Sequence, residues 1–327
     1  MCLHRFSVRQ GRKISDGSGR PYFSCARLNA TTYRIVQDDT FGEKPFIYVK
    51  TNLSTIVIID TGCGPDAAPD PKTRLTSLRD FIERYPVPEN GSLPLNPDGA
   101  KPYTVMCTHC HYDHIGGIEE FGALPATRIW ASGYDADFLS PENLDRSSLC
   151  EYMDVDTPKY SVSNWASDGQ TVTNDSGAEL PLKVYQVPGH TPDQMAIWDS
   201  EERHLFVGDM AYVDAPILFL VGGSAVRYRE SLTKLQRLVE EQNARQQRRV
   251  KLSCGHNISD VDASTLLDQL SQFLQRIMRG DIPPKTQGSG YGLHSLELYS
   301  VEGERISFLG PRSVFTELAD LQASRKV

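Results

Sequence analysis

Long apolar runs are missing from this chain. No stretch of roughly 18 apolar residues, the length that crosses a bilayer, occurs in the 327 residues. The first residues, Met1 to Phe6, also lack the apolar core of a secretion signal. Internal repeats, low-complexity segments and a clear linker are absent as well. These absences predict one cytoplasmic domain over residues 1–327, with no membrane partner.

An excess of positive charge and a cysteine framework are lacking too. The net charge is −8 at pH 7, whereas binding to nucleic acid normally needs a basic face, so we expect no nucleic-acid partner. The seven cysteines follow no regular spacing. Cys107 and Cys110 form a C-x-x-C pair, but no second pair completes a four-thiolate zinc site. We interpret the cysteines as reduced thiols of an intracellular protein.

Histidine is scarce, at 8 of 327 residues, and this makes one short segment stand out. It reads Thr108-His109-Cys110-His111-Tyr112-Asp113-His114-Ile115-Gly116-Gly117. If Tyr103 to Cys107 form a strand, His109 and His111 project to the same side, because strand side chains alternate. Asp113 and His114 are adjacent and leave the chain in different directions, toward a second ion. Imidazole nitrogen and carboxylate oxygen both bind Zn²⁺ at about 2.0–2.2 Å.

The pattern His-x-His-x-Asp-His resembles the signature of the metallo-β-lactamase superfamily, and the resemblance extends from about residue 30 to residue 260. The further ligands of that family are present in order, each after an apolar run: His190, Asp209 and His256. Ile56 to Gly62 matches the family's buried strand that ends in Asp-x-Gly. Taken singly, each of these residues could belong to an ordinary turn or loop. Their shared order favours metal binding.

The resemblance implies a complete ligand set. The first metal's ligands would be His109, His111 and His190, and the second's would be Asp113, His114 and His256, with Asp209 bridging both. Asp60 would hold a ligand histidine in its tautomer from behind. Gly116 and Gly117 are expected to let the backbone turn as a helix begins. The cofactor implied is two Zn ions per chain, or Mn, Fe or Co, because these ligands accept each metal according to supply.

The alternation of strands and helices agrees with the fold that the resemblance implies. That fold is α/β, a four-layer αβ/βα sandwich of two mixed sheets flanked by helices. Hydrophobic periodicity predicts strands at 32–36, 46–51, 56–59, 103–107, 128–132, 182–187, 194–198 and 205–207. It predicts helices at 75–85, 118–121, 229–245 and 264–278, with strands and a helix in 293–327 and an opening strand within 1–29. Residues 138–169 lack clear periodicity and predict either a lid insertion over the site or a packed surface loop.

Two cations a few ångströms apart can share one water, make hydroxide near neutral pH and polarise a carbonyl. Tyr212, three residues after Asp209, resembles the tyrosine of the lactone-opening branch, which hydrolyses acyl-homoserine lactones. The resemblance implies that its phenol binds the substrate carbonyl and that Asp113 carries a proton to the leaving group. A packing role is the alternative for Tyr212. We therefore expect a dinuclear metal-dependent hydrolase that opens a γ-lactone or γ-lactam by attack of a metal-bridging hydroxide.

Other functions stay open at this point. Glyoxalase-II-like thioesterases share every ligand and are the main alternative. A nuclease or phosphodiesterase of the superfamily and a non-catalytic binding protein are less favoured. The partner expected is a small molecule with a carbonyl ring, and the run Ala215 to Val221 lines either its pocket or the ordinary core. The oligomeric state is open, a homo-oligomer included.

Overall fold

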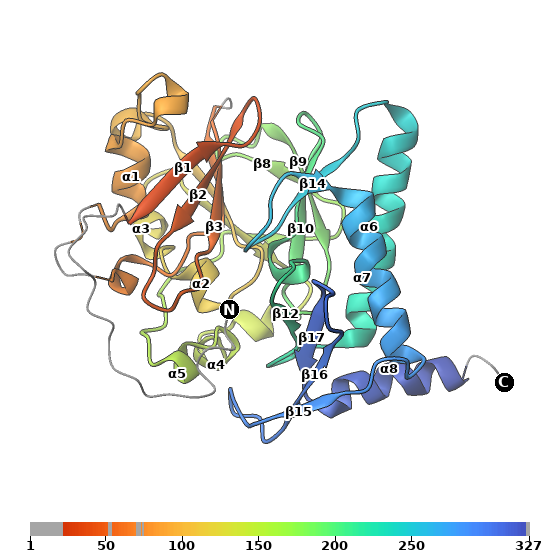
Figure 1. Ribbon diagram of the computed structural model, residues 1–327. Helices are drawn as coiled ribbons and strands as arrows, with labels where there is room; N and C mark the ends of the chain where they lie inside the picture. Colours follow the sequence, from red (N-terminus) through yellow and green to blue (C-terminus); the bar gives the residue numbers. More distant parts are fainter. Residues whose placement is uncertain (1–21, 52–53, 70–72, 74, 325–327) are drawn as a thin grey trace.

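Two large β-sheets face each other in the computed structural model, which describes residues 22–51, 54–69, 73 and 75–324 (Figure 1). The first sheet has seven strands in sequence order. They are β1 (Phe23–Arg27), β2 (Thr32–Gln37), β3 (Phe46–Lys50), β4 (Ile56–Ile59), β5 (Tyr103–Met106), β6 (Arg128–Ser132) and β7 (Asn164–Ala166). Strands β1 to β4 are antiparallel and β4 to β7 are parallel, so the sheet is mixed.

The second sheet has six strands in the order β14-β13-β11-β10-β9-β8. They are β8 (Thr171–Thr173), β9 (Glu179–Gln186), β10 (Met195–Asp199), β11 (His204–Phe206), β13 (Lys251–Ser253) and β14 (Val261–Asp262). Only the β11–β13 pair is parallel, so this sheet is mixed as well. Each strand that the sequence predicts overlaps an observed strand.

Helices cover the outer face of each sheet. The α-helices of the described residues are α1 (Leu78–Arg84), α2 (Tyr112–Ile115), α3 (Glu119–Gly122), α4 (Leu144–Ser147), α5 (Cys150–Met153), α6 (Ala225–Arg245), α7 (Ala263–Met278) and α8 (Arg312–Ser324). In Figure 1, α1 and α3 lie outside the first sheet and α6 and α7 lie outside the second. The four-layer αβ/βα sandwich is therefore confirmed.

Separate apolar clusters fill the spaces between these layers. Trp130 of β6 and Ile197 of β10 belong to the cluster between the two sheets. Phe81 of α1 packs in a cluster with the outer side chains of the first sheet, and Leu235 of α6 packs with those of the second. Ile58, in the fully buried strand β4, has no exposed surface. Burial on both faces requires the continuous apolar run that this strand has.

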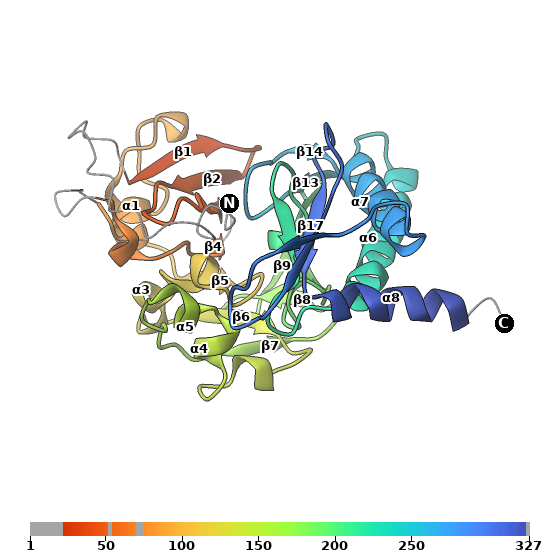
Figure 2. The same ribbon diagram turned by 60° about the horizontal axis from the view of Figure 1, so that its bottom comes forward.

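A third sheet is the main departure from the expected two. It has four strands in the order β12-β17-β16-β15: β12 (Pro216–Leu218), β15 (Lys285–Gln287), β16 (Leu296–Ser300) and β17 (Ser307–Gly310). β12 pairs in parallel with β17, so the end of the chain supports a segment that follows Asp209. In Figures 1 and 2 this sheet lies beside the sandwich, next to α8, and α8 also packs near α6 and α7.

Segment 138–169 forms regular secondary structure over part of its length, although its sequence shows no hydrophobic periodicity. It contains α4, α5 and the edge strand β7. Leu149 and Cys150 are buried in one cluster with Leu296 and Leu309 of the third sheet. The segment therefore packs against the C-terminal strands through apolar side chains. The choice between a lid and a packed loop stays a prediction.

Helix boundaries shift where capping residues decide them. Helix α1 begins at Leu78, not at Leu75, because the Ser77 side chain accepts the hydrogen bond of the Asp80 backbone N–H. Leu75 has a φ of +54° and is 39% exposed, so it lies outside the helix. Helix α6 begins four residues earlier than expected, after the Ser224 cap. Residues 1–21 of the expected opening segment lie outside the described residues.

His204 in β11 predicts an acid-sensitive fold. Burial lowers the pKa of this imidazole to about 3, and its Nε2 lies 2.7 Å from Ser253 Oγ. Between pH 3 and pH 6.5 the unfolded chain, with a histidine pKa near 6.5, binds more protons than the folded protein. The stability that comes from keeping His204 neutral is therefore fully present above pH 6.5 and is lost as pH falls. Between pH 7 and pH 5, the free energy of unfolding of the His204→Gln variant should therefore fall by about 2 kcal/mol less than that of the parent protein. Urea unfolding of metal-free protein measures this, and equal losses would contradict it.

Candidate metal centre

The expected ligands lie in loops that leave one edge of the two sheets. Asp60 follows β4, and the segment 109–114 follows the parallel neighbour β5. His190 follows β9, Asp209 follows β11, and His256 follows β13. Because β11 and β13 are parallel, their ends meet at the same edge. The structure brings all seven predicted ligands together as two adjacent groups.

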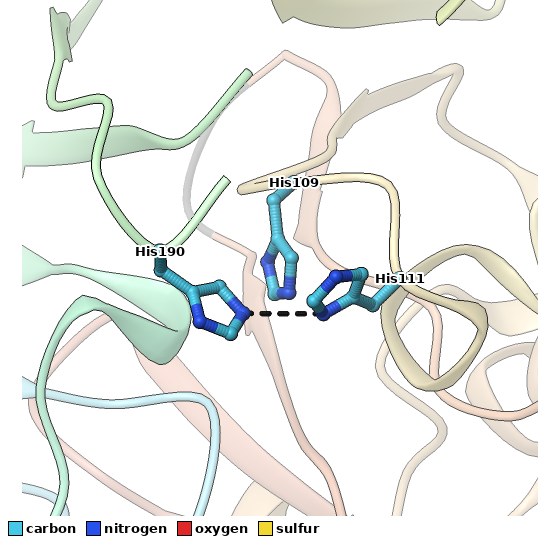
Figure 3. Close-up of side chains that lie close together, drawn as sticks. All are labelled: His109, His111 and His190. Carbon is cyan, nitrogen blue, oxygen red and sulfur yellow. Dashed lines mark hydrogen bonds between the residues drawn. The ribbon is translucent and has the colours of Figure 1, made fainter. Parts of the chain in front are cut away.

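The first group consists of His109, His111 and His190, whose ligand atoms lie within 4.8 Å of one another. Figure 3 shows the three rings converging on one point. His190 Nε2 and His111 Nδ1 are 3.1 Å apart. Two nitrogens on one tetrahedral ion at about 2.0–2.1 Å would be separated by about 3.3 Å, so the distance suits a shared cation.

The second group consists of Asp113, His114, Asp209 and His256, also within 4.8 Å. His256 Nε2 lies 3.1 Å from Asp113 Oδ2 and 3.4 Å from Asp209 Oδ2. His114 Nε2 lies 3.4 Å from Asp209 Oδ1. The rings of His109 and His114 are 4.0 Å apart between centroids, which places the two groups side by side.

Hydrogen bonds on the far side of each ring set the tautomers. Asp60 Oδ2 lies 2.9 Å from His114 Nδ1, and Asp60 also accepts the backbone N–H and the hydroxyl of Thr108. His190 Nδ1 lies 2.7 Å from the Leu218 carbonyl oxygen. His256 Nδ1 is bonded in the same way to a backbone carbonyl at 2.9 Å. In each ring the other nitrogen, Nε2, is therefore left with its lone pair facing the site.

The donor set fits two divalent cations. His109 Nε2, His114 Nε2 and Asp209 Oδ1 are buried and make no hydrogen bond within the described part of the chain. Such buried polar atoms are costly unless a partner is bound. Imidazole and carboxylate donors suit Zn, Mn, Fe or Co, so the donor chemistry does not select one metal.

The electrostatics of the two groups differ. Burial lowers the pKa of His109, His111 and His190, with His111 at about 3, so the first group is neutral. Burial opposes ionisation of Asp209, yet the neighbouring imidazoles of His256 and His114 hold the pKa of its carboxyl well below the usual range. The second group therefore keeps its carboxylates ionised. A bound dication can take the place of the protons that these carboxylates attract.

The glycines act by close approach. Gly116 and Gly117 lie in the expected turn, just before helix α3 begins at Glu119. Helix α2 begins at Tyr112, before them, and Gly116 has a right-handed helical φ of −57°. A Cβ on Gly117 would lie 2.6 Å from the Thr61 carbonyl oxygen, and one on Gly116 would clash with the backbone of Cys63. These residues let the end of α2 pack directly on the loop after β4.

Five of the seven proposed ligands, drawn from both groups, form the floor of a pocket that opens to solvent. Its lining is Glu43, His111, Tyr112, Asp113, Leu149, His190, Asp209, Tyr212, Ala215, Pro216, Leu218, His256 and Asn257. Tyr212 is 5% exposed and its hydroxyl donates a hydrogen bond to the Pro216 carbonyl oxygen at 3.0 Å. From the run 215–221, Ala215, Pro216 and Leu218 line the pocket, whereas Ile217 and Phe219 belong to the core.

Sequence reasoning missed four lining residues: Glu43, Tyr112, Leu149 and Asn257. Tyr112 stands inside the histidine motif, so its proximity was available from the sequence. Asn257 directly follows a ligand and has a φ of +62°, a conformation that asparagine tolerates. Leu149 lies within segment 138–169, for which the sequence offered a lid over the site as one interpretation. Glu43 is far from every motif, and no local pattern marks it.

Comparison with known proteins gives the family. Residues 46–256, which include all the proposed ligands, match the Metallo-beta-lactamase superfamily. This chain belongs to the metallo-β-lactamase superfamily. It is 33% identical over 285 residues to "Putative transcription factor avaE" of Aspergillus versicolor, covering 86% of this chain and 84% of that protein.

Two enzymes of the superfamily are also similar. "Acyl-coenzyme A thioesterase MBLAC2" of Gallus gallus is 26% identical over 61% of this chain and 69% of that protein. A hydroxyacylglutathione hydrolase of Rhodospirillum rubrum is 31% identical over 50% of this chain and 51% of its own length. A metallo-beta-lactamase family protein from Thermus thermophilus shares the fold, with a TM-score of 0.53 and 19% identity over 78% of this chain and 84% of that one.

Other predictions concern the surroundings of the site. Cys107, Cys110 and Cys254 are buried, and each lies within two residues of a proposed ligand in the sequence. Burial raises the pKa of these three thiols well above the usual value, so they are protonated. Among the described residues, no helix has the length and apolar character needed to cross a membrane.

Gly255 provides a test of the second group. A Cβ at this position would clash with Asp209 Oδ1 and lie 2.7 Å from His114 Cε1. Gly255→Ala should therefore displace two proposed ligands and lower the bound metal from two ions per chain to about one or none. Metal analysis after dialysis measures the loss. Gly288→Ala is the matched control, because a Cβ there meets nothing within 4 Å, and equal metal content in the two variants would count against this packing.

Proposed function

We propose that this superfamily hydrolase binds two metal ions and opens a cyclic ester or amide, a γ-lactone or γ-lactam. The observation that carries the proposal is that both ligand groups form the floor of the pocket whose wall includes Tyr212. His109, His111 and His190 would hold the first ion, and Asp113, His114 and His256 the second, with Asp209 reaching both. Asp60 would keep His114 oriented.

When bound, the two cations would supply an acidified water and polarise the substrate carbonyl. The protein side chains contribute orientation and proton transfer. Asp113 lies at the pocket surface, 3.1 Å from His256 Nε2, and its carboxylate can carry a proton to the leaving group.

Tyr212 would hydrogen-bond the oxygen of the substrate carbonyl as charge develops on it. Its single hydroxyl proton points to the Pro216 carbonyl oxygen in the free protein. Rotation of that hydroxyl about its C–O bond would redirect the proton to a substrate in the same pocket. Leu149 and Leu218 would pack on the apolar part of the ring, and segment 138–169 would act as a wall for it.

The lining favours an uncharged, compact substrate. Among the described residues that line the pocket, none is lysine or arginine. A phosphate-bearing or carboxylate-bearing carrier would need such cations near the reacting group. The relatives named as an acyl-coenzyme A thioesterase and a hydroxyacylglutathione hydrolase nevertheless keep thioester hydrolysis as the second candidate.

A nucleic-acid substrate has weaker support. The name of the Aspergillus versicolor relative is the observation that favours it. The net charge of −8 is of the wrong sign for a phosphate backbone, and the basic residues at the end of α6 face acidic side chains. Arg248 pairs with Glu202 at 3.4 Å, and Arg249 pairs with Asp262 at 3.4 Å.

A substrate panel tests the proposed function. Metal-loaded protein should hydrolyse γ-lactones or γ-lactams faster than thioesters of coenzyme A or glutathione, and it should leave phosphodiesters intact. Asp209→Ala should abolish turnover and reduce bound metal, because Asp209 faces both imidazoles of the second group. Asp214→Ala, at an exposed residue paired with Arg305, should retain both. If thioesters are hydrolysed faster than lactones and lactams, thioester hydrolysis replaces ring opening as the proposed function.

Tyr212→Phe tests the phenol. The variant should lower kcat by about tenfold or more while leaving two metal ions bound, because one donor to the developing charge is removed. Tyr228→Phe is the matched control, because its buried hydroxyl also donates to a backbone carbonyl, that of Met210, but does not line the pocket. If the two variants are equally fast on the best lactone, Tyr212 has only a packing role.

A further inference from the structure

Glu43 places a buried carboxyl group in the wall of the pocket. Its side chain is 6% exposed and lines the same pocket as Asp113 and His256. The Tyr112 hydroxyl donates a hydrogen bond to Glu43 Oε1 at 2.8 Å. The carboxyl group is therefore held as a hydrogen-bond acceptor within the site.

The loop that carries Glu43 is rigid before any substrate binds. The carboxylate of Asp39 accepts backbone N–H groups from four residues of this loop at 2.7–3.2 Å: Phe41, Gly42, Glu43 and Lys44. The Phe41 ring packs edge-on against Tyr112, with centroids 5.3 Å apart. A preorganised polar group loses little entropy when it binds a partner, so such a loop suits recognition.

The backbone and the side chain of Glu43 have separate roles. Its backbone carbonyl accepts the hydrogen bond from His256 Nδ1 and so orients a proposed metal ligand. Its side chain binds Tyr112 instead. Replacing the side chain therefore leaves the bond to His256 in place, and metal binding can be separated from substrate recognition.

We propose that Glu43 determines substrate specificity by accepting a hydrogen bond from a hydroxyl or amide N–H on the leaving-group side of the reacting ester. This inference rests on the proposed hydrolase function. The Glu43 backbone carbonyl contacts His256 Nδ1, and His256 Nε2 lies 3.1 Å from Oδ2 of Asp113, the proposed proton carrier to the leaving group. Glu43 therefore lies on that side of the pocket. A neutral donor fits better than an ammonium group, because the cations proposed at the floor would repel a positive charge.

The probes are two γ-lactones that differ in one donor. One is γ-hydroxymethyl-γ-butyrolactone and the other is its methyl ether. Wild-type, metal-loaded protein should prefer the hydroxyl compound by about tenfold or more in kcat/KM, because the ether has no proton to donate to the Glu43 carboxyl group. The ring-opened products, titrated by calorimetry, should show the same preference in Kd.

Three variants identify the source of the preference. Glu43→Leu removes the acceptor, and Glu43→Gln keeps an oxygen for the Tyr112 hydroxyl while placing an amide in the pocket. Both should lose most of the preference while retaining two metal ions. Glu43→Gln should also keep the parent melting temperature, because its amide oxygen still accepts the Tyr112 hydroxyl. Glu151→Gln, at an exposed residue of α5, should retain it.

The outcomes separate the inference from the proposed function. A preference that survives Glu43→Leu and Glu43→Gln overturns the role of Glu43, as does equal kcat/KM for the two lactones in the parent. If neither lactone is hydrolysed, the proposed function fails, and the product titration still decides the role of Glu43. A hydroxyl preference in Kd that is lost in both variants supports the role, and equal or unmeasurable affinities overturn it.

Discussion

The buried carboxylate of Asp60 is the contact on which the rest of the site depends. It ends β4 in a left-handed backbone conformation, with a φ of +61°, and accepts hydrogen bonds from Thr108 and His114. Its side chain thus ties the loop after one strand to the histidine loop after the next. A residue held in this uncommon conformation needs such compensation from its surroundings. Without it, the His114 ring would lose the hydrogen bond that orients it toward the second ligand group.

The third sheet gives the C-terminal part of the chain a direct connection to the site. β17 pairs with β12, and β12 presents two carbonyl groups toward functional side chains. The Leu218 carbonyl oxygen binds His190 Nδ1, and the Pro216 carbonyl oxygen accepts the Tyr212 hydroxyl. Leu296 and Leu309 fill the apolar space behind this strand together with Leu149. A segment beyond the part that matches the family therefore positions one proposed ligand and one proposed catalytic residue.

The charge distribution gives the two ligand groups different characters. The first group is made of three imidazoles that burial keeps neutral, and the second pairs two carboxylates with two imidazoles. The remaining pocket surface is apolar except for a few groups, among them Glu43 and Tyr212. Each such polar group can affect which ligand the pocket admits, because an unmatched buried partner is costly. The polar groups of the pocket that lie outside the two ligand groups are few.

The sequence alone determined the fold class and predicted which residues come together as the two ligand groups. The motif from His109 to His114 is local, and His190, Asp209 and His256 each follow an apolar strand, so order along the chain carries their identity. Strand alternation and helix periodicity depend on neighbours a few residues apart, which is why they can be predicted. Only the tertiary structure decided the third sheet, the role of Gly116 and Gly117 in close packing, and the presence of Glu43 in the pocket. These features depend on contacts between segments far apart in sequence, such as the 213 positions between Glu43 and His256, and no local pattern encodes them.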